Sequence, residues 1–63
     1  MKFDEYKKIF YRQDDGAWVA EIPCIGGCYA LMHTREEALA ELCNVFQMIE
    51  EEYREKGLEL PVD

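Results

Sequence analysis

Apolar and polar side chains alternate along residues 2–11, which is the pattern of a β-strand. A second alternating segment, residues 17–22, stops at Pro23, which has no N–H to donate to a neighbouring strand. Asp14-Asp15-Gly16 lies between them, and an Asp-Gly pair supplies the positive-φ residues of a tight hairpin, so the two segments are expected to pair. The second strand is expected to face the core with Trp18, Ala20 and Ile22.

A third strand is expected over residues 28–33, after a flexible connector at residues 24–27. Three strands joined in sequence order form an antiparallel meander, and such a sheet is stable only when one face is covered. The third strand has Tyr29, Leu31 and His33 on one face and Cys28, Ala30 and Met32 on the other, and the first strand has Tyr6, Lys8 and Phe10 opposite Lys7, Ile9 and Tyr11.

The expected cover is a long helix that follows Thr34. Thr34-Arg35-Glu36-Glu37 is a capping box, because the Thr34 hydroxyl can accept from the Glu37 amide while the Glu37 side chain reaches back. Gly57 and Pro61 end the helix. Its apolar stripe is Leu39, Leu42, Cys43, Phe46, Ile49 and Tyr53. The sequence therefore predicts one α+β domain over residues 1–63, a three-stranded antiparallel meander covered by one helix.

This helix is longer than the strands, so its C-terminal half is expected to overhang the sheet. Met48, Ile49 and Tyr53 lie on the overhang and need a cover. The cover is either a partner chain, which predicts a homodimer or a higher homo-oligomer, or Leu58-Glu59-Leu60 folding back as a short fourth strand.

Composition limits the class of protein. A chain of 63 residues with 49% hydrophobic side chains is a single small globular domain near the lower limit for independent folding. It has no apolar run long enough for a membrane helix and no secretory signal at Met1. Its three cysteines, an odd number, fit free thiols in a reducing compartment. A cytoplasmic location without membrane contact is expected.

The formal net charge is −7, from 14 acidic and 7 basic side chains. This charge opposes direct binding to nucleic acid and favours encounter with a basic protein. The expected contact residues are Glu37, Glu41 and Glu51 on the outer face of the helix and Asp14 and Asp15 in the hairpin. The run at residues 50–52 is read as a solvated helix face, with docking of Arg and Lys side chains as the alternative.

Residues suited to a zinc site are present but poorly spaced. Cys24 and Cys28 have the separation of one zinc knuckle, no second pair exists, and Cys28 and His33 point to opposite sides of their strand. Cys43 belongs to the apolar stripe of the helix. The cysteines are therefore interpreted as structural thiols, and no metal or cofactor is predicted.

The candidate catalytic residues do not form a convincing catalytic site either. A cysteine nucleophile with His33 as base lacks a third group to orient the imidazole. Asp14, Asp15 and Glu21 could form a magnesium site for cutting phosphodiesters, but the turn already explains the two aspartates. No catalytic residue is predicted, and a metal-dependent nuclease stays the remote alternative.

Residues 11–42 resemble the HicB family of antitoxins. The likeness rests on the Asp-Gly hairpin, the string Trp18-Val19-Ala20-Glu21-Ile22-Pro23, the Gly27-Cys28 pair, and Thr34 with Glu36-Glu37-Ala38-Leu39. It continues through the helix to Gly57 and Pro61. Each motif is short, but their order and spacing together are fairly specific.

The resemblance implies a truncated ribonuclease-H-like fold without nuclease carboxylates, which neutralises a small basic toxin that cleaves messenger RNA, of the HicA type. Many members also carry a C-terminal DNA-binding segment, for which this chain has no room after Asp63. It also departs from the family at Gly26, where a Pro is usual, and at His33, where a small residue is usual. The alternative reading is an orphan domain that self-associates.

Overall fold

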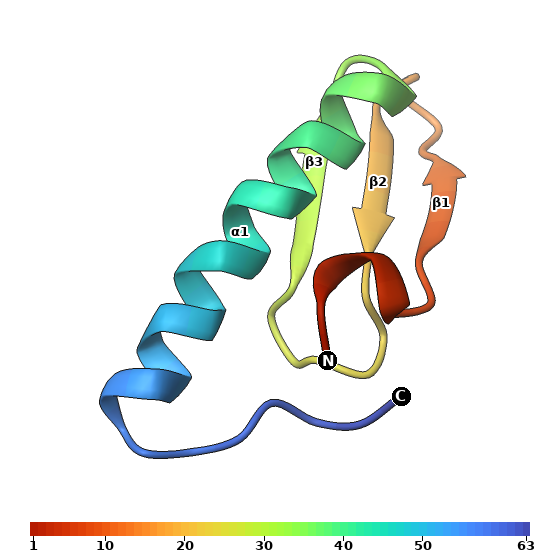
Figure 1. Ribbon diagram of the computed structural model, residues 1–63. Coiled ribbons are helices and arrows are strands. Elements are labelled where there is room, and N and C mark those ends of the chain that lie inside the picture. Colours follow the sequence, from red (N-terminus) through yellow and green to blue (C-terminus); the bar gives the residue numbers. More distant parts are fainter.

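The computed structural model describes residues 1–63, the whole of the chain. A three-stranded antiparallel sheet in the order β1-β2-β3 is covered on one face by α1, with a single turn of 3-10 helix, η1, before the first strand (Figure 1). This confirms the predicted α+β architecture. In chain order the elements are η1 (Phe3–Glu5), β1 (Ile9–Arg12), β2 (Trp18–Glu21), β3 (Tyr29–Met32) and α1 (Arg35–Glu55).

The register of the sheet confirms the predicted alternation. Phe10 pairs with Ala20, which pairs with Ala30, and these three residues share the face that packs under α1. Tyr11, Val19 and Leu31 are the next row of partners and share the opposite face, because successive side chains of a strand point to opposite sides.

The hairpin between β1 and β2 differs in detail from the expected tight turn. The Gln13 N–H donates to the Ala17 carbonyl at 2.8 Å, which leaves a three-residue loop of Asp14, Asp15 and Gly16. Only Gly16, at φ +90°, has a positive φ, so the prediction that the Asp-Gly pair supplies two such residues was wrong for Asp15. Asp15 instead accepts the Ala17 N–H at 3.0 Å through its carboxylate, a local bond that Asp readily makes in turns.

The two ends of α1 are those that the sequence predicts. Thr34 is the N-cap, and its hydroxyl oxygen accepts the Glu37 N–H at 3.1 Å. The last turn closes at Lys56, after which Gly57 takes the left-handed conformation with φ +69°.

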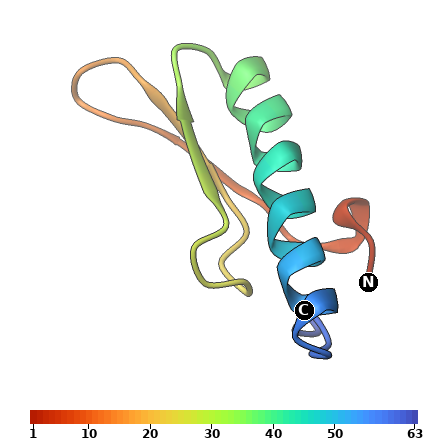
Figure 2. The same ribbon diagram turned by 90° about the vertical axis from the view of Figure 1, so that its left-hand side faces the viewer.

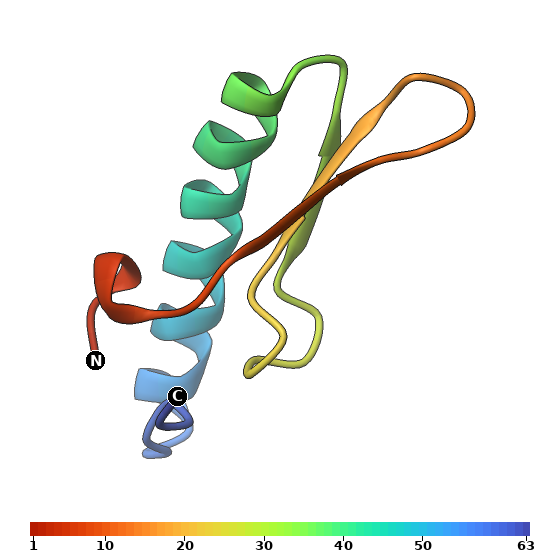
Figure 3. The ribbon, with the colours of Figure 1, turned by 90° about the vertical axis from the view of Figure 1, so that its right-hand side faces the viewer.

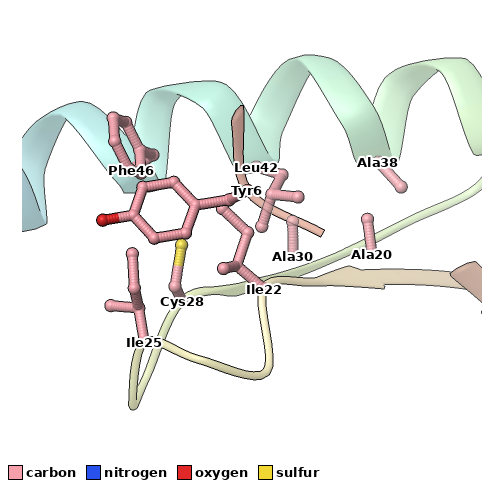
Figure 4. Packing of buried hydrophobic residues seen from close by; sticks show 9 residues of the cluster. All are labelled: Tyr6, Ala20, Ile22, Ile25, Cys28, Ala30, Ala38, Leu42 and Phe46. Carbon is pink, nitrogen blue, oxygen red and sulfur yellow. The ribbon is translucent and has the colours of Figure 1, made fainter. Parts of the chain in front are cut away.

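The core lies between α1 and the sheet. Leu42 and Phe46 point from α1 toward Ile22 and Cys28, and the ring of Tyr6 fills the space between Phe46 and the loop after β2 (Figure 4). The buried cluster consists of Tyr6, Ala20, Ile22, Ile25, Cys28, Ala30, Ala38, Leu42 and Phe46.

The N-terminal segment is not the long strand that its alternation predicts, since η1 occupies residues 3–5 and β1 begins only at Ile9. The turn brings two aromatic rings onto one helix residue. The ring centroids of Phe3 and Tyr6 lie 5.4 Å and 5.7 Å from that of Phe46. A straight strand would point Phe3 and Tyr6 to opposite sides, so this packing favours the turn.

The overhang of α1 is covered by the chain itself, without a fourth strand. Residues 58–63 run back from the end of α1 toward the N-terminus (Figure 1). Leu60 packs against the core, and the Tyr6 hydroxyl donates to the Pro61 carbonyl. Of the three predicted oligomer contacts, Ile49 packs against the core, Tyr53 is half-buried and Met48 remains 62% exposed.

Candidate protein-binding surfaces

The outer side of α1 is strongly acidic. Seven carboxylates lie on this helix, against two arginines, Arg35 and Arg54. The structure contains one salt bridge, between Lys56 Nζ and Glu52 Oε1 at 2.9 Å. The other six carboxylates, on Glu36, Glu37, Glu41, Glu50, Glu51 and Glu55, therefore have no cationic partner within the chain. These seven glutamates are called the acidic helix surface below.

The predicted contact residues Glu37, Glu41 and Glu51 fall on one stripe of α1, since they are separated by one and by almost three helical turns. Glu37 is partly committed to the helix start, because its carboxylate accepts the Thr34 hydroxyl at 3.1 Å. Glu41 accepts an Asn44 amide N–H at 3.3 Å. Glu51 is exposed and free of such bonds, so its charge is the most available of the three.

Asp14 and Asp15 lie elsewhere. They form the tip of the β1-β2 hairpin, which projects away from α1 (Figure 2). With Tyr11, Arg12 and Gln13 they line a wide concave surface of about 490 Å³. The structure therefore separates the five predicted partner contacts into two groups, and the hairpin tip is a second, smaller acidic site.

The residues considered for chemistry do not come together. Glu21 ends β2 opposite Ile9, whereas Asp14 and Asp15 lie beyond the other end of that strand. No group of three His, Cys, Asp or Glu side chains is placed to hold a metal ion. Cys24, Cys28 and Cys43 are free thiols, and burial raises the pKa of the Cys28 thiol, which keeps it protonated within the core.

Sequence reasoning missed a second surface, on the side of the sheet away from α1. Ile9, Tyr11, Tyr29 and Leu31 are exposed there by 39%, 46%, 61% and 50%. Val19 lies between Tyr11 and Leu31 in the register and is only 5% exposed. These five residues are called the open sheet face below. The alternation had already grouped these residues by face within each strand, and their apolar character was the signal.

No helix crosses the open sheet face, which is bare in two views from opposite sides of the molecule (Figures 2 and 3). Neither helix of the chain combines the length and the apolar character that crossing a membrane requires. The molecule thus presents two surfaces of different chemistry, one charged and one apolar, on opposite sides. Comparisons with protein-family models, with curated proteins and with solved structures found no match to this chain.

Proposed function

We propose that this chain is an antitoxin-like binding module of the cytoplasm, which neutralises a small basic mRNA-cleaving toxin of the HicA type by protein contact. The observation that carries the proposal is the acidic helix surface, where six carboxylates on one exposed helix lack an ion partner. The resemblance to HicB antitoxins supports the choice of partner.

The electrostatic argument concerns both stability and recognition. Like charges three or four residues apart on a helix repel each other, so the acidic helix surface slightly destabilises the isolated chain. A basic partner removes that repulsion and is steered toward the surface by the net charge of −7. The same charge disfavours contact between this chain and RNA, so neutralisation acts on the toxin and not on its substrate.

The test first asks whether the adjacent gene encodes a very short basic protein with a single conspicuous His. Binding kinetics are then measured with that protein, its His replaced to permit expression. Glu41→Lys and Glu51→Lys change the charge of the acidic helix surface without touching the N-cap. We expect the association rate to fall by about three- to tenfold for each, with a smaller change in the dissociation rate. Glu59→Lys, exposed and outside α1, makes the same charge change and is the matched control.

Equal kinetics for Glu51→Lys and Glu59→Lys would show that net charge alone steers the toxin and that α1 is not the docking surface. A neighbouring toxin that binds none of these variants, nor the unaltered chain, would reject the antitoxin function itself.

The remote alternative, a metal-dependent nuclease, predicts magnesium-dependent RNA cleavage that is lost on Asp15→Asn.

A further inference from the structure

The open sheet face is large for so small a domain. About half of each of its four exposed side chains, Ile9, Tyr11, Tyr29 and Leu31, is accessible to solvent. At roughly 200 Å² for a large side chain, this leaves on the order of 400 Å² of contiguous apolar surface, a size at which exposed patches are often functional. Scattered apolar residues would need no such explanation, but the register places these in one block.

Charge distinguishes the open sheet face from the rest of the molecule. Of the six strand positions on this side, Glu21 alone is charged, and it is half-buried between Ile9 and Tyr29. The acidic helix surface lies on the other side of the sheet, behind the core. A basic partner therefore has little to recognise on the open sheet face. Beside it, Arg12, Asp14 and Asp15 lie next to Tyr11 at the hairpin tip. A second copy of this chain, which carries the same −7, therefore meets fewer like charges here than on α1.

We propose that the open sheet face binds a second copy of this chain, so that two sheets stack face to face with both α1 helices outward. The contact is isologous, since each copy offers the same aromatic and aliphatic block to the other. Stacked sheets pack with their faces about 10 Å apart and their strands within about 30° of one another. Both acidic helix surfaces remain free in this dimer.

The size of the interface sets the strength of the dimer. Two copies would bury on the order of 800 Å² of apolar surface, and roughly 1,000–1,200 Å² with the polar rim, which is at the lower limit of specific interfaces. A concentration-dependent dimer with a Kd in about the micromolar range is therefore expected. This placement differs from the overhang of α1, where Ile49 already packs against the core of its own chain.

The edge of β3 offers a rival arrangement for a second copy. Ala30 pairs with Ala20, and the bonded pairs alternate along the strand, so the Leu31 N–H and carbonyl point away from β2. β3 also carries no charged residue or Pro to block edge pairing. Edge pairing would cover Tyr29 and Leu31 but leave Tyr11, on β1, exposed. A substitution at Tyr11 therefore separates stacking from edge pairing.

The experiment is analytical ultracentrifugation of the whole chain without any partner, from about 1 μM to about 1 mM. The variants are Leu31→Lys and Tyr11→Lys, and the matched control is Met48→Lys, an exposed apolar residue on α1. Each substitution adds one positive charge and so changes the net charge from −7 to −6. Because this change weakens repulsion between copies, lost association cannot be ascribed to it. Far-UV circular dichroism verifies that each variant is folded.

We expect the unaltered chain to pass from monomer to dimer in this range. Leu31→Lys and Tyr11→Lys should each raise the Kd of the dimer by at least about tenfold, whereas Met48→Lys should leave it within about twofold. A chain that stays monomeric throughout overturns the proposal. An equal loss of dimer affinity in Met48→Lys also overturns it, because the contact between copies would then lie on the helix. A loss of affinity in Leu31→Lys but not in Tyr11→Lys overturns it as well, because the contact would then lie at the β3 edge. None of these results bears on toxin binding.

Discussion

The helix and the sheet of this molecule differ in how they distribute apolar and charged side chains between their two faces. α1 divides into an apolar stripe that contacts the core and a remaining surface that carries seven carboxylates, of which Glu41 and Glu50 are half-buried. The sheet does not divide in this way, since it is apolar toward α1 and also apolar on the open sheet face. A two-layer domain needs only one apolar face on its sheet. The second apolar face is therefore the feature that folding of a single chain leaves unexplained.

This difference between a charged and an apolar surface indicates which kind of partner each surface would bind. Carboxylates without cations attract a basic protein from a distance but contribute little apolar area. Tyr11, Tyr29 and Leu31 provide area but no long-range attraction. The two proposed contacts do not compete for the same surface, because α1 and the open sheet face lie on opposite sides of the core (Figure 3).

The largest expected effect comes from breaking the core that holds the two sides together. Leu42 is fully buried at the centre of α1, so Leu42→Ala removes buried apolar volume that the neighbouring side chains cannot refill. We expect a loss of about 2–5 kcal/mol in the free energy of unfolding, which leaves a domain of this size largely unfolded. Urea denaturation at a fixed protein concentration measures it.

Met48→Ala is the control for this loss, because Met48 is exposed on the same helix and its truncation should cost less than about 0.5 kcal/mol. If both variants unfold at the same urea concentration, Leu42 does not join the helix to the sheet in the way described.

A smaller effect concerns Tyr6, which ties the terminal segments together beneath α1. Burial, and then the nearby Cys24 and Asp63, raise the pKa of the Tyr6 phenol above its usual value. The folded state therefore holds this proton more tightly than the unfolded state. Its contribution to stability is complete below the unfolded pKa of about 10 and is lost as the pH rises through the higher folded pKa. We expect the melting temperature to fall as the pH is raised above about 10.

Tyr6→Phe tests that assignment. Losing the hydrogen bond from the Tyr6 hydroxyl to the Pro61 carbonyl should cost about 1–1.5 kcal/mol at neutral pH. The variant should also lose less stability between neutral and alkaline pH than the unaltered chain. Tyr29→Phe, at an exposed tyrosine, should change neither quantity. An alkaline transition that persists fully in Tyr6→Phe assigns it to another group.

The parts of the fold that sequence reasoning predicted are those with local signals. The Thr34 cap, the stripe that includes Leu42 and Phe46, and Gly57 lie within one continuous segment, and they define α1 almost to the residue. The alternation in β2 and β3 likewise grouped correctly the side chains that share a face. Each of these signals reports on neighbours a few positions away.

The parts that sequence reasoning missed depend on distant contacts. Residues 2–8 alternate as a strand does, but the rings of Phe3 and Tyr6 pack on Phe46, which is distant in the sequence. The fourth strand expected at residues 58–60 does not form. Instead the Leu58 N–H donates to the Tyr53 carbonyl at the end of α1, and the Pro61 carbonyl accepts the Tyr6 hydroxyl.

The two candidate surfaces show the same division. Glu37, Glu41 and Glu51 could be assigned to the outer side of α1 from helical periodicity alone. The open sheet face could not be recognised until the register placed its residues from three strands in one block. That is a property of the whole fold and not of any segment.

Salt offers the smallest effect and the sharpest comparison, because it should act in opposite directions on the two surfaces. Raising the ionic strength from about 0.05 M to about 0.5 M shortens the screening length from roughly 14 Å to roughly 4 Å. Attraction between the acidic helix surface and a basic toxin then weakens, and the association rate should fall several-fold. Repulsion between two copies of a chain with charge −7 weakens as well, so self-association through the open sheet face should tighten by about two- to threefold. Sedimentation of the chain alone and binding kinetics with the toxin, in the same buffers, measure the two shifts.

If both interactions weaken with salt, the contact between copies depends on charge pairs and not on the apolar block of Tyr11, Tyr29 and Leu31. If both strengthen, the toxin also binds through apolar contacts, and the open sheet face becomes its docking surface.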